Sequence, residues 1–360
     1  MTLATSPTKG MASRLASEPK HGLRQRLILL YSVLVTANIA AWLWAFAVFR
    51  DQPVMLGTAF LAYVLGLRHA VDPDHIAAID NVTRKLLQDG GRPATVGFWF
   101  ALGHSTVVIL ACLVIAFLAS GANGVMDEFR DIGSLIGTTV SSLFLLVIGI
   151  ANLAIFIGVW RTFRNAKRTG RYREEDLDAI VGRHGFLSRL LRPLFSRISK
   201  SWHMYPLGFL FGLGFDTATE IGLFSLAAAN AANGVSLSTV MVFPVLFAVG
   251  MALADATDGA LMLGAYEWAY VNPIRKLFYN LVITGLSVFI ALVIGLVQGV
   301  GLIAEKLELS GAFWSDLAAL RDHFDILGFI IVGLFIAIWA ISALVYKLGG
   351  YDAIELEKEA

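Results

Sequence analysis

Eight long apolar stretches divide this chain, and they constrain its fold more than any other feature. They lie near residues 27–49, 54–79, 94–119, 132–160, 206–230, 236–264, 277–304 and 324–348. Each is longer than the roughly 20 residues that a helix needs to cross a bilayer. Transmembrane strands, in contrast, alternate polar and apolar residues in segments of about ten. The pattern therefore predicts an all-α polytopic membrane protein, a bundle of about eight transmembrane helices.

The charge content excludes several other classes of protein. Only 15% of the residues are charged, whereas about a quarter are charged in a soluble domain. The net charge is +1 and no basic face accompanies a soluble fold, so nothing indicates nucleic-acid binding. The single cysteine, Cys112, excludes a disulfide framework and any multi-cysteine metal site. What remains is a membrane protein whose surface contacts lipid.

The distribution of basic residues predicts the orientation of the chain. Most of the 28 Lys and Arg residues fall in segments that share one side of the membrane. These segments are a tail over residues 1–26, loops near 80–93 and 265–276, a long basic loop over 161–205 and a tail over 349–360. The opposite loops hold only Arg50, Arg130, Lys306 and Arg321. Because positive residues collect on the cytoplasmic side, we expect a transmembrane domain over 27–348 with both termini in the cytoplasm.

Ionisable residues occur inside four of the apolar stretches, although each costs at least ~2.5–3.5 kcal/mol at a helix centre. The four segments read GLRHAVDPDHIAAID, GFWFALGHSTVV, GLGFDTATEIG and GMALADATDGALM. Their candidate functional residues are His69, His75, His104, Asp72, Asp74, Asp216, Thr217, Glu220, Asp255, Asp258 and one arginine, Arg68. The other four stretches have no acid or histidine in their apolar cores. We expect four helices to hold the chemistry and four to insulate it.

The residue types in this cluster predict a cation site. Imidazoles combined with carboxylates suit divalent first-row transition metals, whereas Mg²⁺ and Ca²⁺ sites are built from oxygen ligands. Arg68 is expected to neutralise a neighbouring carboxylate. His104 has two interpretations, a metal ligand and a hydrogen-bonded packing histidine. Asp80 is expected to begin a cytoplasmic loop and to cap the end of the helix before it.

The spacing of the polar residues in the span near 54–79 predicts which of their side chains share a helix face. At 100° per residue, His69, Asp72 and His75 share one helix face. Asp74 points elsewhere on an ideal helix, but Pro73 removes a backbone N–H and forces a kink or a break. We expect this change to turn Asp74 toward the same centre and to free the His69 carbonyl as a further ligand.

The spans near 206–230 and 236–264 carry carboxylate pairs. Asp216 and Glu220 share one helix face, and so do Asp255 and Asp258. Glycines surround all four polar segments, either for close helix packing or for local unwinding. GLRHAVDPDH and GLGFDTATEI are weakly similar and lie in spans of opposite direction. They predict an inverted repeat around the ion site.

One family shares these motifs. The segment RHAVDPDHIAAIDNVTRK resembles the second-helix signature of the nickel/cobalt permease family, often called NiCoT, whose core is a His, four residues and then Asp-His. FALGHSTVV, LGFDTATEIG and GMALADATDG followed by LMLGAYEWAY also resemble that family's motifs. The resemblance implies uptake of Ni²⁺ and Co²⁺ through a bacterial inner membrane, with ion recognition at His69, Asp74 and His75. Pro73 departs from the family pattern, which more often has Ala there.

Together these observations predict a secondary transporter that imports divalent transition-metal ions. His69, Asp74 and His75 are expected to bind the ion, with Asp72 and His104 nearby. Arg68, Asp216, Thr217, Glu220, Asp255 and Asp258 are expected to line its path or support its ligands. Ni²⁺ or Co²⁺ is then the substrate, and no separate cofactor is expected.

Two other classes of function compete with this prediction. A transporter of protons or other cations would use the acids and keep the histidines for structure. An intramembrane metalloprotease would need an H-E-x-x-H helix, which the sequence lacks. A Walker-type glycine loop is also missing, so no nucleotide hydrolysis is expected and the chain is predicted not to be an enzyme.

Overall fold

The fold is known from a computed structural model that describes residues 20–118, 125–169, 198–214, 218–232, 234–269, 273–322 and 324–348. Every regular element within these ranges is a helix, which confirms the all-α prediction. The elements are α2 (Lys20–Phe49), α3 (Pro53–His69), α4 (Pro73–Gln88), α5 (Val96–Leu118), α6 (Val125–Thr169), η1 (Ser201–His203), α9 (Met204–Phe211), α10 (Ala218–Ala232), α11 (Leu237–Val240), α12 (Val242–Ala269), α13 (Pro273–Lys306), α14 (Ala312–Asp322) and α15 (Phe324–Leu348).

The number of membrane spans is only partly settled by these helices. Five are long and apolar enough to cross a membrane, or six if the bent pair α3–α4 is one span. The span predicted near 206–230 is divided between α9 and α10, which are both short, and the one near 324–348 corresponds to α15. These helices indicate a multi-pass membrane protein, and the number of eight membrane spans stays a prediction.

The break predicted near Pro73 separates α3 from α4, and the two helices bend by 51°. Asp72 has extended backbone angles and Pro73 opens α4. A proline restricts the residue before it to extended conformations and suits the first position of a helix. The Asp72 N–H donates to the His69 carbonyl at 3.0 Å, so the expectation that the break frees this carbonyl is wrong.

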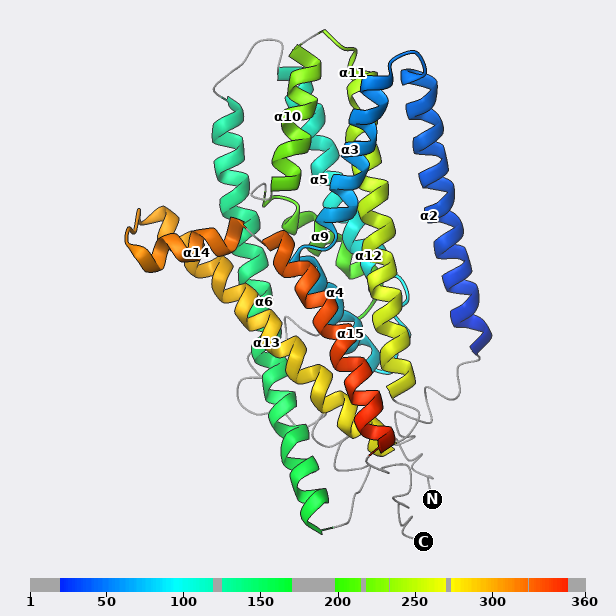
Figure 1. Ribbon diagram of the computed structural model, residues 1–360, viewed down its shortest axis with the longest axis vertical. Helices are drawn as coiled ribbons and strands as arrows, with labels where there is room; N and C mark the ends of the chain where they lie inside the picture. The colour runs from blue at the N-terminus through cyan, green and yellow to red at the C-terminus, as the bar shows by residue number, and fades with distance from the viewer. Residues whose placement is uncertain are drawn as a thin grey trace, which may run out of the picture.

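A second interruption lies between α9 and α10, where residues 212–214 are not helical. Asp216 and Thr217 lie outside the described residues. Figure 1 shows that α3 and α4 run toward one end of the bundle, whereas α9 and α10 run toward the other. This opposite direction is what the inverted repeat requires, and the repeat itself stays a prediction.

The C-terminal half of α4 differs from the sequence prediction. The helix continues to Gln88, so the prediction that a loop begins at residue 80 is wrong. Asp80, Asn81 and Arg84 are fully buried side chains of α4. Asp80 therefore does not cap a helix end, and Arg84 is not a loop residue facing the cytoplasm.

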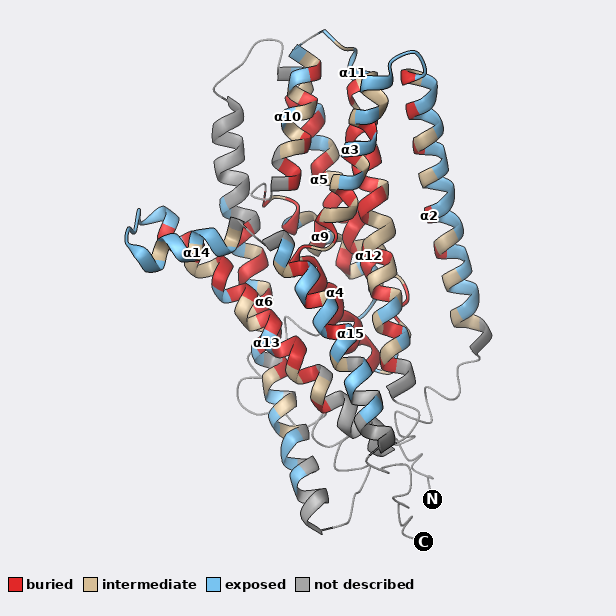
Figure 2. Cartoon of the chain, in the orientation of Figure 1, coloured by how far each residue is buried: buried red, intermediate tan, exposed pale blue. Residues whose placement is uncertain are grey.

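Helix α12 is central to the packing and contacts α2, α3, α4 and α5, while α13 packs along α6. Figure 2 shows buried residues concentrated where these helices meet, whereas α2 is largely exposed. Glycines allow the close approach: a Cβ at Gly66 would lie 2.1 Å from the Phe247 carbonyl oxygen, and one at Gly97 would lie 1.9 Å from that of Asp255. Close packing at small residues is thus confirmed at these two positions.

Candidate metal centre

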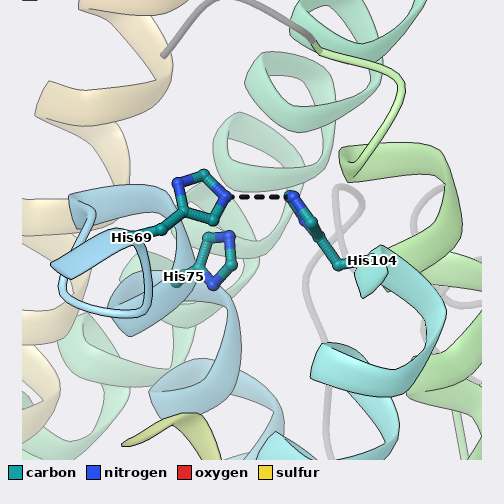
Figure 3. Close-up of side chains that lie close together, drawn as sticks. All are labelled: His69, His75 and His104. Carbon is teal, nitrogen blue, oxygen red and sulfur yellow. Dashed lines mark hydrogen bonds between the residues drawn. The ribbon is translucent and has the colours of Figure 1, made fainter. Parts of the chain in front are cut away.

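Three histidines from three helices meet where the broken span contacts α5 (Figure 3). His69 ends α3, His75 lies in the first turn of α4 and His104 lies in α5. One ring nitrogen from each lies within 4.8 Å of the others, and the Nε2 atoms of His69 and His104 are 3.0 Å apart. We call His69, His75 and His104 the histidine centre.

Two fully buried carboxylates contact this centre from other helices. Glu220, in the first turn of α10, places its Oε1 2.9 Å from Nε2 of His104 and 3.7 Å from Nε2 of His69. Asp255 of α12 places its Oδ2 3.2 Å from Nδ1 of His75. The structure therefore brings residues of all four polar segments to one point, as the sequence analysis requires of a shared site.

The remaining nitrogen of His69 is held by polar groups at the helix break. Its Nδ1 lies 2.9 Å from Oδ2 of Asp72 and 3.1 Å from Oγ1 of Thr219. A carboxylate on one ring nitrogen fixes the orientation of an imidazole and increases its basicity as a ligand. Asp72 is thus placed to orient His69 while Nε2 faces His104.

The histidine centre is enclosed by aromatic rings. The ring of Phe247 lies 5.5 Å from that of His69, and the ring of Phe100 meets that of His75 edge-on at 4.8 Å between centroids. Each of the three histidines is at most 3% exposed. Low-dielectric surroundings strengthen the attraction of the nearby carboxylates for a cation.

The distances suit a metal ion. Ligand atoms at about 2.1 Å from an ion and at right angles to each other are about 3.0 Å apart, which is the separation of Nε2 of His69 and of His104. Among the described residues, Nε2 of His75 has no hydrogen-bond partner. Buried nitrogens are normally hydrogen-bonded, so this atom is available to a ligand.

Asp74 is oriented differently from the other predicted ligands. Its Oδ1 accepts from the backbone N–H of His75 at 3.0 Å, while Oδ2 lies 3.5 Å from the Ser141 hydroxyl of α6 and 3.4 Å from Nε2 of Gln298 of α13. Ser141 also donates to Gln298 at 2.8 Å. From the sequence we expect α6 and α13 only to insulate the site, whereas in the structure each contributes a polar side chain that lies near Asp74. Ser141 and Gln298 are uncharged residues within apolar helices, so no sequence pattern indicates that they lie near the site.

Two other predicted residues lie on helices that carry residues of the site. Asp258 of α12 is half-buried, and its Oδ2 has no hydrogen-bond partner among the described residues. Arg68 lies in the last turn of α3 and is half-buried. Its role as a neutralising partner stays a prediction.

A second buried polar cluster occupies the C-terminal half of α4, and the sequence analysis missed it. Asp80 accepts hydrogen bonds from the hydroxyls of Tyr266 and Ser287. Arg84 donates to Oδ1 of Asn81 at 2.8 Å, and Asn152 donates to the same oxygen at 2.6 Å. We call these six residues, from α4, α6, α12 and α13, the α4 network. The sequence predicts a loop at Asp80, Asn81 and Arg84 because the apolar stretch ends at residue 79.

The sequence profile of one protein family matches residues 55–345, and that family is described as high-affinity nickel-transport protein, NicO. The chain belongs to this family. The match includes all three residues of the histidine centre and the complete α4 network. It confirms the resemblance to nickel/cobalt permeases.

Relatives of known name agree with the NicO assignment. A high-affinity nickel transport protein of Cupriavidus necator is 54% identical over 92% of this chain and 95% of its own. The hydrogenase nickel incorporation protein HupN of Bradyrhizobium diazoefficiens is 55% identical over 88% of this chain and 83% of its own. A cobalt transport protein, NhlF, of Rhodococcus rhodochrous is 38% identical over 79% of this chain and 81% of its own. No solved structure matches this NicO chain.

Proposed function

We propose that this chain is a secondary transporter that imports Ni²⁺, Co²⁺ or both across the bacterial cytoplasmic membrane. The observation that carries the proposal is the convergence of three buried imidazoles with Glu220 and Asp255 inside an apolar bundle. Buried carboxylates need a cation to offset the loss of solvation. Imidazole and carboxylate together suit first-row divalent metals, and relatives bear the names of nickel and cobalt transport proteins.

In this proposal, the histidine centre binds the ion directly. Glu220 and Asp255 neutralise its charge and, with Asp72, hold the imidazoles in place. Asp74 receives the ion beside Ser141 and Gln298 before it reaches the histidines. The family resemblance supports a direct role for Asp74 in ion recognition. Four further residues are assigned to the ion path from the sequence alone: Arg68, Asp216, Thr217 and Asp258.

The family resemblance supports inward transport, and the distribution of charge supports the orientation of the chain. The distribution of Lys and Arg supports cytoplasmic termini, and α2 begins at the end of the bundle where α15 finishes (Figure 1). A dication that moves inward across 100 mV gains about 4.6 kcal/mol, from about 2.3 kcal/mol per charge. Because tenfold accumulation costs about 1.4 kcal/mol, the potential alone sustains roughly a thousandfold gradient. The proposal therefore includes no nucleotide hydrolysis and no enzymatic reaction.

Uptake of radiolabelled Ni²⁺ and Co²⁺ into proteoliposomes tests this proposal. We expect His69→Ala and His75→Ala each to lower uptake at least about tenfold, because each removes a ligand that fixes the ion. His203→Ala is the matched control, since His203 lies in η1 and its Nδ1 accepts from the Ser199 N–H. Undiminished uptake in both histidine variants would reject the site. Uptake of alkali cations or protons, without either metal, would favour the competing class of transporter.

A further inference from the structure

Helix α15 contacts the break between α3 and α4 through a glycine. Gly328 is buried, and a Cβ added to it would lie 1.7 Å from the Val71 carbonyl oxygen and 3.5 Å from Cδ of Pro73. A carbon atom and a carbonyl oxygen normally stay at least about 3.3 Å apart. Only a residue without a side chain therefore fits at this point of α15, which lies across α4 (Figure 1).

The Val71 carbonyl belongs to the turn that joins two residues of the histidine centre. His69 ends α3 before this turn, and His75 lies in the first turn of α4 after it. In a continuous helix the His75 N–H would donate to the Val71 carbonyl, but here it donates to Oδ1 of Asp74. Among the described residues, no backbone N–H donates to the Val71 carbonyl. The break thus leaves this oxygen to a partner from another helix.

Gly328 provides that partner. Inside a membrane, irregular backbone is tolerated where it is buried in protein. The direction of the added Cβ shows that a Cα hydrogen of Gly328 points at the Val71 oxygen, and such Cα–H···O contacts recur where helices pack closely. One turn later, Ile331 lies in the same buried apolar cluster as Ile76 of α4. Helix α15 is therefore packed both on the break and on the helix that follows it.

The position of the break determines how two of the imidazoles face each other. The ring centroids of His69 and His75 are 4.7 Å apart. A methyl group on residue 328 would force Val71 and α15 apart by about 1.5 Å, the difference between the 1.7 Å contact and an ordinary carbon–oxygen distance. Metal–ligand distances vary by only about 0.2 Å. A shift of the turn between the two histidines therefore disturbs a site that both must share.

We propose that Gly328 is a positioning residue of the metal centre. Its contact with the Val71 carbonyl fixes the break, and the break fixes the relative positions of His69 and His75. This inference rests on the proposed function, since it requires that the histidine centre binds the ion. Helix α15 then controls the affinity and geometry of binding without contacting the ion, although its sequence indicates only an insulating helix.

The test is the affinity of the purified full-length protein for Ni²⁺, measured by titration calorimetry, together with the visible spectrum of bound Co²⁺, which reports coordination geometry. We expect Gly328→Ala to lower the affinity at least about tenfold, as loss of groups that orient ligands does, and to change the spectrum. Gly333→Ala is the matched control, because nothing lies within 4 Å of its added Cβ. A folded Gly328→Ala protein with wild-type affinity and spectrum overturns the proposal.

A second control separates positioning from general packing. Ile331→Ala removes apolar contacts of α15 but keeps the contact of Gly328 with the break. We expect it to lower the unfolding temperature and to leave the Ni²⁺ affinity and the Co²⁺ spectrum unchanged. Equal losses of affinity in Ile331→Ala and Gly328→Ala would refute a specific role of Gly328. A wild-type chain that binds no Ni²⁺ would instead contradict the proposed function.

The Pro73→Ala background covers the case in which Gly328→Ala alone does not fold. Without the proline, Asp72 is no longer restricted to extended conformations, so the Val71 peptide can turn away from an added methyl group. Because residues in contact have non-additive effects, we expect Gly328→Ala to lower the Ni²⁺ affinity by about threefold in this background. Equal affinities of Pro73→Ala and the double variant would overturn the proposal.

Discussion

The histidine centre and the α4 network are both buried and polar, but their side chains are arranged differently. In the histidine centre, Nε2 of His75 and Nδ1 of His104 have no hydrogen-bond partner within the described ranges. In the α4 network, both oxygens of Asp80 accept hydroxyl hydrogen bonds, and Asn81 joins Arg84 to Asn152. The first cluster has imidazole nitrogens that can accept a metal ion, whereas the α4 network satisfies its carboxylate and amide oxygens itself and leaves two donors of Arg84, Nε and Nη1, without a partner among the described residues. Burial of polar groups therefore does not by itself distinguish binding from stability.

The largest expected effect is on stability, at Asp80. Asp80→Ala removes the carboxylate that accepts from the buried hydroxyls of Tyr266 and Ser287. Loss of a buried hydrogen-bond partner costs about 1–3 kcal/mol for each group affected, which gives about 2–6 kcal/mol for the two hydroxyls. We expect the free energy of unfolding, measured by denaturant titration in micelles, to fall by this amount. Asp89→Ala is the control, because Asp89 is exposed and its ion pair with Lys85 is worth about 0–1 kcal/mol. Similar losses in the two variants would mean that the α4 network contributes no more to stability than an exposed ion pair.

The next largest expected effect is also on stability, and it concerns the packing of α5 against α12 beside the histidine centre. Gly97→Ala would place a Cβ 1.9 Å from the Asp255 carbonyl oxygen, so α5 and α12 must separate. We expect a loss of about 3 kcal/mol in the free energy of unfolding, at the upper end of typical overpacking. In Gly57→Ala, nothing lies within 4 Å of the added Cβ, and helix propensity predicts a gain of up to about 1 kcal/mol. A neutral Gly97→Ala would show that the two helices adapt freely.

A third prediction concerns binding at the histidine centre. Asp255→Asn keeps the shape of the side chain but removes the negative charge 3.2 Å from Nδ1 of His75. Loss of a carboxylate that orients a histidine ligand weakens metal binding about 10–100-fold. Titration calorimetry with Ni²⁺ measures this change, and Asp316→Asn on the exposed surface of α14 is the control. Unchanged affinity would mean that His75 is oriented by the fold alone.

The histidine centre was largely predictable from the sequence, and the α4 network was not. His69 and His75 stand out because ionisable groups are rare in apolar spans, and Pro73 marks the break by its missing N–H. Asp80 and Arg84 follow the last apolar residues, so hydropathy assigns them to solvent. Their burial depends on the packing of α4 against α12 and α13, which no local pattern encodes. The approach of Glu220 to His104 likewise results from tertiary packing.

The smallest expected effect is at Asp74, whose contacts with Ser141 and Gln298 are long. Ser141→Ala removes a hydroxyl 3.5 Å from Asp74 Oδ2, and Gln298 remains at 3.4 Å. A single neutral hydrogen bond contributes about 0.5–1.5 kcal/mol. We therefore expect KM for Ni²⁺ uptake to rise about two- to fivefold, with an unchanged maximal rate.

The neighbouring Ser142 separates this effect on Asp74 from an effect on helix packing. Its hydroxyl donates to the Gly295 carbonyl at 2.7 Å and so joins the same two helices, α6 and α13. If Ser141 acts by positioning Asp74, Ser142→Ala should lower stability by about 1 kcal/mol and leave KM unchanged. Equal increases of KM in both variants would mean that α6 and α13 act only as a scaffold. The two helices would then insulate the site, as the absence of ionisable groups in their apolar cores first indicated.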